Sequence, residues 1–155
     1  NNFAVVGMPG RFSNQGAIVN YLTTQSGQLT EDTTIVPTAT STIGLGTSLD
    51  SGDNYVVSGA PDSSSGRGHV YVYTRNFLGQ ISQQQILAAN TSNACAFGTS
   101  ISISDDDQWL YVGAPNNSNV YVYGFDNTIT SANTTVVGNF FNRSCRLSRL
   151  RKPSS

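Results

Sequence analysis

The chain has few charges and few of the residue types on which most enzymes depend. Charged residues make up 11% of its 155 positions, and there is a single glutamate, histidine and tryptophan. One histidine cannot form a histidine pair for a metal or a proton relay, and no Ser–His–Asp or Cys–His spacing stands out. Helix-favouring Ala, Leu, Glu and Lys are scarce beside Asn, Ser, Thr and Gly, which favour short strands and turns. The sequence therefore predicts a β protein with no enzyme activity, catalytic residue or cofactor.

Long apolar runs are also missing. No segment approaches the roughly 20 apolar residues that would span a bilayer, and no signal-peptide pattern is present. Five of the eight basic residues lie in the last 13 positions, whereas the first 142 residues hold three arginines against nine acidic residues, a net charge of −6. An acidic body argues against a nucleic-acid partner. We interpret residues 140–155 as a basic C-terminal tail, disordered or non-native.

What the chain does have is an internal repeat. Three short segments occur in the middle of the chain: Leu-Gly-Thr-Ser at 45–48, Gly-Ala-Pro at 59–61 and Val-Tyr-Val-Tyr at 70–73. They occur again in the same order at 97–100, where Phe replaces Leu, at 113–115 and at 120–123. A partial third copy of the second half stands at the start, with Gly-Met-Pro at 7–9. The anchor glycines Gly7, Gly59 and Gly113 are spaced by 52 and 54 residues. A period of about 50 residues indicates units that bury their apolar faces against one another.

Each full unit is typical of four short strands. For the middle unit the predicted strands are 46–49, 54–60, 69–75 and 82–89, with a flexible loop at 62–68; for the last unit they are 98–104, 109–114, 119–125 and about 130–137. The first unit repeats the fourth strand at 33–36. In the third strand, Val and Tyr alternate and so point to opposite faces.

We divide the chain into units at about 1–42, 43–94 and 95–139. Four-stranded antiparallel units of this length are typical of β-propeller blades. The predicted fold class is therefore all-β, with about three blades per chain and an incomplete ring as a monomer.

Among propeller repeats, the motif (Phe/Leu)-Gly-Thr-Ser … Gly-Ala-Pro … Val-Tyr-Val-Tyr closely resembles the FG-GAP repeat of integrin α-chain propellers and of similar bacterial and phage proteins, over residues 1–139. The chain has no Gly-Gly doublet of Kelch repeats, and Trp109 is not followed by the Asp of WD40 repeats. The resemblance implies a non-enzymatic adhesion or recognition scaffold that is extracellular, on a cell surface or on a virion. Two alternatives stay open: an accessory propeller domain of a larger secreted or surface enzyme, and a purely structural virion component.

The resemblance also bears on partners. Family propellers close with about seven blades, and an open stack of fewer units exposes edges and apolar faces that tend to associate. We expect either a homo-oligomer or the remainder of a longer propeller to complete the ring, and a protein or glycan as ligand. Cys95 and Cys145 lie 50 residues apart, so a bridge between neighbouring units and two free thiols both remain open.

FG-GAP repeats often hold Ca²⁺ in an Asp-rich loop before the Gly-Ala-Pro segment, which makes these turns the first metal candidates. The acidic residues available there are Asp50, Asp53, Asp105 and Asp107. The family's loop ends in an Asp four or five residues before the motif glycine, and no Asp stands at those positions in either unit. A hard cation needs several converging oxygens, so we expect no bound metal.

Surface loops are the remaining candidates for a site, because propellers usually bind partners through loops on a rigid scaffold. If strand order follows the family, loops 10–16, 62–68 and 116–119 share one face with the connections near 38–45 and 90–97. The candidate binding residues on this face are Arg11, Phe12, Asp62, Arg67, Asn116 and Asn117. Arginine and aromatic residues are the types enriched among residues that dominate binding energy.

Overall fold

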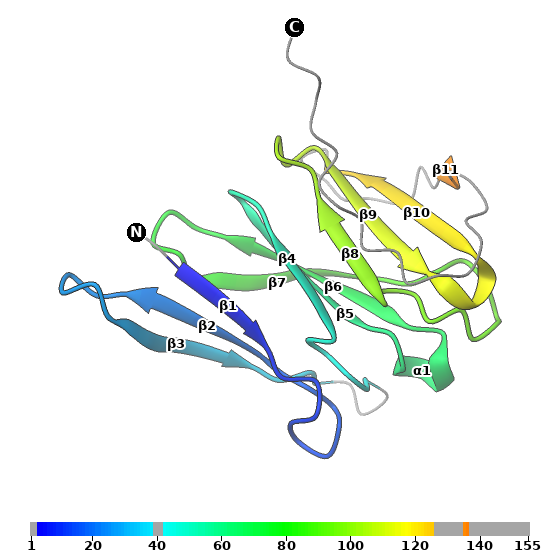
Figure 1. Ribbon diagram of the computed structural model, residues 1–155, viewed down its shortest axis with the longest axis horizontal. Helices are drawn as coiled ribbons and strands as arrows, with labels where there is room; N and C mark the ends of the chain where they lie inside the picture. The colour runs from blue at the N-terminus through cyan, green and yellow to red at the C-terminus, as the bar shows by residue number, and fades with distance from the viewer. Residues whose placement is uncertain (1–2, 39–41, 126–134, 137–155) are drawn as a thin grey trace, which may run out of the picture.

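The residues that the structure describes form three antiparallel sheets that follow one another along the chain (Figure 1). The computed structural model describes residues 3–38, 42–125 and 135–136. The first sheet has the order β1 (Phe3–Gly7), β2 (Ile18–Thr23), β3 (Leu29–Ile35); the second has β4 (Ser48–Ser51), β5 (Tyr55–Ala60), β6 (His69–Arg75), β7 (Ile81–Leu87); the third has β8 (Ser100–Ile103), β9 (Trp109–Ala114), β10 (Asn119–Gly124), β11 (Thr135–Val136). The only helical segments among these residues are the short turns α1 (Ser63–Gly66) and η1 (Pro115–Asn117). The predicted all-β class is confirmed, and the three sheets do not close into a ring.

The first strands of the second and third sheets, β4 and β8, begin two residues later than the sequence predicts. Strand β4 starts at Ser48 instead of residue 46, and β8 starts at Ser100 instead of residue 98. The reason is that Gly46 and Gly98 have φ angles of +93° and +91°. This left-handed conformation suits glycine and interrupts an extended strand.

Other elements differ from the prediction by a few residues at their ends. The predicted loop 62–68 contains the short turn α1, within which Ser64 and Ser65 have left-handed φ angles of 52° and 60°. Strand β3 starts at Leu29 instead of residue 33, and β7 ends at Leu87 instead of residue 89. Strands β6 and β9 coincide with the prediction. Most of the predicted strand 130–137 lies outside the described residues.

The register makes the three sheets equivalent position by position. Ile18 pairs with Ile35 as Val70 pairs with Leu87, and a bulge follows the third residue of β2 and the fourth residue of β6 at matching places. Tyr121 pairs with Val136 as Tyr71 pairs with Ile86. Any residue of one sheet can therefore be compared with its counterpart in the next.

The apolar core lies between the sheets and not within any one of them. On β6, Val70 and Val72 pack with residues of the third sheet, whereas Tyr71 and Tyr73 pack with Ile18 of the first sheet. The alternation of Val and Tyr thus supplies two interfaces at once, as the sequence predicts. Cys95 is a buried free thiol in the first of these clusters and donates to the Arg67 carbonyl at 3.1 Å; Cys145 lies outside the described residues.

Glycine meets glycine where neighbouring sheets touch. A Cβ added at Gly59 would lie 2.0 Å from the carbonyl oxygen of Gly98, and one added at Gly7 would lie 2.2 Å from that of Gly46. The motif glycines are therefore required because the next sheet approaches the backbone itself.

Polar bonds reinforce the same interface between the second and third sheets. The Ser48 hydroxyl donates to the Gly98 carbonyl at 2.6 Å. The Ile103 amide donates to the Asp50 carboxylate at 2.8 Å. These donors and acceptors are about one repeat apart in sequence, so the repeat period is built into the contact.

We predict that the two Gly-Ala-Pro glycines differ in their sensitivity to substitution. Gly59→Ala forces a Cβ against backbone of the third sheet, and we expect a loss of about 1–3 kcal/mol of unfolding free energy. At Gly113 the Cβ would meet only the Ser100 side chain within 3 Å, which can rotate away. Urea unfolding of Gly59→Ala and Gly113→Ala checks this; equal losses would contradict the assigned contact.

We also predict that the fold loses stability in alkaline solution. Burial, and to a lesser extent the neighbouring Tyr71, raises the pKa of Tyr73, while burial followed by Tyr121 and Cys95 raises the pKa of Tyr123. The Tyr73 hydroxyl has no hydrogen-bond partner among the described residues. Because the folded state keeps these protons when the unfolded chain loses them, stability is full below about pH 10 and falls above it.

Thermal unfolding between neutral pH and pH 11 measures this loss, and the Tyr73→Phe/Tyr123→Phe variant should show a weaker decline. The matched control is Tyr111→Phe, which replaces a half-exposed tyrosine. An identical decline in the double variant and the control would contradict the prediction.

Candidate recognition surface

The predicted loops and connections lie along one edge of the molecule, which we call the loop edge (residues 10–16, 43–45, 62–68, 94–97 and 115–118). Loop 10–16 accepts hydrogen bonds from the first connection: the Gly44 amide donates to Asn14 at 2.8 Å and the Leu45 amide donates to Gln15 at 3.0 Å. Residues 16 and 45 also form a parallel bridge. The first loop is therefore fixed to the start of the second sheet.

The same ladder continues at the next connection. The Ala96 amide donates to the Gly66 carbonyl at 2.9 Å and the Phe97 amide donates to the Arg67 carbonyl at 3.0 Å. The Asn116 amide then donates to the Cys95 carbonyl at 3.3 Å. The structure thus brings the three predicted loops onto one edge; that they bind a partner stays a prediction.

Loop 10–16 holds an arginine and an aromatic ring in solvent. Phe12 is 45% exposed, and the Arg11 guanidinium lies 5.0 Å from the centre of its ring. Phe12, Ser13 and Asn14 have φ angles of 52°, 54° and 67°, three consecutive non-glycine residues in the left-handed region. Each such residue costs of order 1–2 kcal/mol, and strain of this kind concentrates at functional sites.

The other candidate residues differ in how available they are. Asp62 and Arg67 are exposed on either side of α1. Asn116 is exposed, but its side-chain carboxamide donates to the Ala94 carbonyl at 3.3 Å. Asn117 is half-buried and donates to the Tyr121 hydroxyl at 3.2 Å. Arg11, Phe12, Asp62 and Arg67 are consequently the more accessible of the six.

His69 lies beside the loop edge at the start of β6. Burial, and secondarily the Arg67 charge, lowers the pKa of its imidazole. Its Nε2 is 3.4 Å from the Ser64 hydroxyl, and its Nδ1 is buried without a hydrogen-bond partner among the described residues. A neutral imidazole in this position packs against the Tyr71 ring, with the ring centres 6.5 Å apart.

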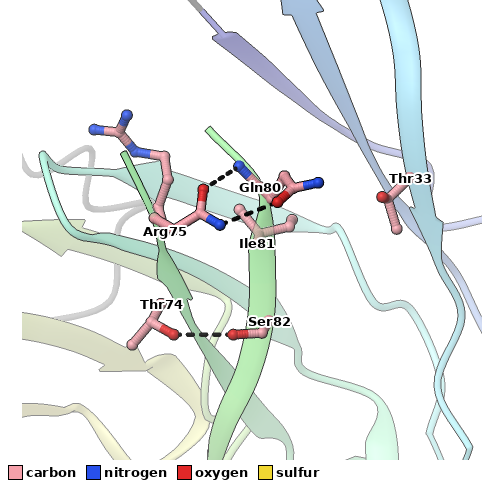
Figure 2. Close-up of a pocket in the computed structure, with 7 residues that line it drawn as sticks. Thr33, Thr74, Arg75, Gln80, Ile81 and Ser82 are labelled. Carbon is pink, nitrogen blue, oxygen red and sulfur yellow. Dashed lines mark hydrogen bonds between the residues drawn. The ribbon is translucent and has the colours of Figure 1, made fainter. Parts of the chain in front are cut away.

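A second concave site, not predicted from the sequence, lies between the first and second sheets (Figure 2). Its cavity of about 400 Å³ is lined by hydroxyl, amide and guanidinium groups: Thr33, Thr74, Arg75, Asn76, Gln80, Ile81 and Ser82. We call it the inter-sheet groove. Figure 2 shows Thr33 on one side and the side chains of the β6–β7 hairpin on the other. Sequence reasoning missed it because its two sides are about 40 residues apart and carry no motif.

The hairpin side of the groove is ordered by its own hydrogen bonds. The Asn76 carboxamide accepts from the amides of Leu78 and Gln80 at 3.0 Å and donates to the Gln80 side chain at 3.1 Å. The hydroxyls of Thr74 and Ser82 are 3.1 Å apart. The result is a preformed surface of neutral polar groups with a single cation.

That cation, Arg75, ties the two sheets together. Its guanidinium lies 4.1 Å from the centre of the Phe3 ring. It also donates to the carbonyls of Gly52 and Asp53. These contacts hold the charge at the rim of the groove.

The four acidic candidates do not converge on a cation position. One Asp50 oxygen accepts from Ile103 and the other from Ser51 at 2.9 Å. One Asp107 oxygen accepts from the Asn54 backbone amide at 2.7 Å and from its side chain at 3.1 Å. Within residues 3–38, 42–125 and 135–136, no group of three His, Cys, Asp or Glu side chains is arranged for a metal. Asp50 and Asp107 instead join the second and third sheets.

Comparison with known proteins supports the fold alone. No protein-family model matches the chain, and no curated relative matches it. The crystal structure of a protein from Lactobacillus plantarum, a structural genomics target, is similar with a TM-score of 0.55 and 20% sequence identity, over 81% of this chain and 36% of that one. That protein has a propeller-like fold. The chain spans about a third of its length.

The comparison therefore supports a propeller-like all-β architecture and leaves the FG-GAP assignment as a prediction. No helix in the described part of the chain is long and apolar enough to cross a bilayer.

We predict that Asp50 stabilises the sheet interface without any cation. Because Asp50→Ala leaves the Ile103 amide without its acceptor, we expect a loss of about 1–3 kcal/mol of unfolding free energy. The loss should be the same in Ca²⁺ and in chelator. Urea unfolding in both conditions provides the measurement, with exposed Asp62→Ala as a control that stays close to wild type. A wild-type stability that rises with micromolar Ca²⁺ would contradict this role.

Proposed function

We propose that this chain is a non-enzymatic recognition scaffold of the adhesion type, built from FG-GAP-like propeller blades. It acts outside a cell, on a cell surface or on a virion. The observation that carries the proposal is loop 10–16, which displays Arg11 and Phe12 on a strained backbone fixed to the neighbouring sheet.

The loop is closed on itself as well as anchored. The Met8 carbonyl accepts from the amides of Arg11 and Ala17, both at 3.1 Å, and the Gly16 amide donates to the Arg11 carbonyl at 2.9 Å. A loop that is ordered before binding loses little conformational entropy when a partner arrives. This preorganisation is what distinguishes it from an ordinary solvated turn.

The chemistry of the tip indicates the ligand class. A guanidinium offers paired donors to a carboxylate, and an exposed ring offers a flat apolar contact. Together they suit a ligand with a carboxylate next to an apolar face, a pattern present in protein ligands and in acidic glycans. Arg67 and Asp62 lie farther along the same loop edge and would contact the periphery of such a ligand.

The test is binding of the labelled chain to an array of acidic and neutral glycans and to immobilised extracellular proteins. We expect binding to at least one class of carboxylate-bearing ligand, and a loss of tenfold or more, about 1.4 kcal/mol, in the Arg11→Ala/Phe12→Ala variant. Phe77→Ala is the matched control, because Phe77 is 89% exposed in the β6–β7 turn, away from the loop edge.

Equal binding by both variants would overturn the assignment of the site to loop 10–16. An absence of binding to every ligand on both arrays would favour a purely structural component instead.

A further inference from the structure

The third sheet presents an outward face whose counterpart in the second sheet is an interface. We call it the open face; its residues are Ser100, Trp109, Gly113, Val120 and Val122. In the second sheet the equivalent positions are Ser48, Tyr55, Gly59, Val70 and Val72, and the third sheet covers them. Three independent contacts show what kind of surface the open face fits.

The first contact involves the glycine and the serine. Gly59 touches the Gly98 carbonyl, and the Ser48 hydroxyl donates to the same oxygen at 2.6 Å. At the open face, the three described atoms nearest to a Cβ built at Gly113 all belong to Ser100 of the same sheet. Within the described residues, the open face therefore has the same glycine and serine as the Gly59 contact, and no glycine carbonyl is among the atoms nearest to Gly113.

The second contact involves the first residue of the equivalent strands β1, β5 and β9, which is aromatic in all three. Phe3 lies under the Arg75 guanidinium at 4.1 Å, and Tyr55 stacks on Phe125 with ring centres 4.2 Å apart and an interplanar angle of 13°. Arg75 and Phe125 occupy the same register position, two residues after the Val-Tyr-Val-Tyr segment. Trp109 is the third member of the series and is 49% exposed.

The third contact involves the valines of the third strand. Val70 and Val72 are fully buried against the third sheet, whereas Val120 and Val122 are only half-buried. Apolar side chains in this strand alternate so that one set always faces the following sheet. The open face thus leaves apolar surface uncovered at the positions where its counterparts form a core.

We propose that the open face docks a further repeat unit of the same kind. The partner unit carries a glycine two residues before its first strand, and the carbonyl of this glycine contacts Gly113. It also carries an arginine or aromatic residue at the end of its third strand, and that side chain covers Trp109. The second and third sheets both have this chemistry, with Gly46 and Arg75 in one and Gly98 and Phe125 in the other.

A second copy of this chain docking by its first sheet does not fit. Thr23 stands at the register position of Arg75, so the first sheet offers neither a cation nor a ring to Trp109. Among the described residues β1 pairs only with β2, so the first sheet has no counterpart of β4 or β8 and of the glycine that precedes each of them. The occupant is therefore a unit like the second or the third.

The experiment adds such a unit in cis and follows Trp109, the only tryptophan of the chain. A second copy of residues 36–87 is inserted between Val137 and Gly138, so that all natural residues remain. This point continues the repeat, because Val136 pairs with Tyr121 as Ile86 pairs with Tyr71. We expect acrylamide quenching of Trp109 to fall about twofold or more as the ring is covered, with emission shifted to shorter wavelength.

Two matched controls carry a substitution within the inserted copy only. Gly46→Val should restore the quenching of the natural chain, because a side chain there meets backbone of the preceding sheet within 2.8 Å and requires a positive φ. Arg75→Ala should leave the unit docked but Trp109 partly accessible. A parallel insertion of residues 88–137 provides an independent unit that carries Gly98 and Phe125.

A second readout is energetic and does not rely on fluorescence. In the extended chain, Gly113→Ala should become as destabilising as Gly59→Ala, because Gly113 would then have the same neighbour. Trp109 that stays as accessible as in the natural chain overturns the proposal, as does equal protection by the Gly46→Val control or failure of both insertions to give one cooperative transition. Concentration-dependent shielding of Trp109 in the natural chain would also overturn it in favour of a second copy.

Discussion

The structure depends on a backbone-to-backbone contact between neighbouring sheets. Gly7 and Gly59 each lie against the carbonyl of a glycine in the following sheet, Gly46 and Gly98 respectively, so neither has room for a Cβ. This contact brings the sheets close enough for the apolar cores between them to form, and for Asp50 and Asp107 to accept hydrogen bonds across the gap. Because each core is shared by two sheets, stability belongs to pairs of units more than to single units.

The candidate sites are consequences of that spacing. The loop edge is continuous because the end of each connection between sheets donates hydrogen bonds to the loop of the preceding sheet, as Leu45 does to Gln15. The inter-sheet groove forms where the β6–β7 hairpin faces β3, on the rim of the same interface. The loop edge, the inter-sheet groove and the apolar cores therefore share their structural support, and a change that separates the sheets should disturb all three.

The sequence predicted the strands correctly where a motif occurs in more than one unit. Copies of Gly-Ala-Pro and Val-Tyr-Val-Tyr located β5, β6, β9 and β10, and the Val and Tyr alternation assigned the two faces of β6 correctly. It was a poorer guide to the starts of β4 and β8, because the left-handed backbone of Gly46 and Gly98 is a consequence of contact with another sheet. The roles of Asp50 and Asp107 were hidden for the same reason, since their acceptor function depends on residues about 50 positions away. The groove had no sequence signal, because Thr33 and Gln80 belong to different units.

Native-state amide hydrogen exchange tests the central claim most directly. The amides of Asn54, Ile103, Leu45 and Phe97 donate between units. If the glycine contact holds the sheets as one body, these amides should exchange as slowly as central sheet amides such as that of Val57, through a common opening reaction. Exchange of the inter-unit amides about a hundredfold faster than that of Val57, a difference of about 2.7 kcal/mol, would show sheets that open independently and would contradict the account.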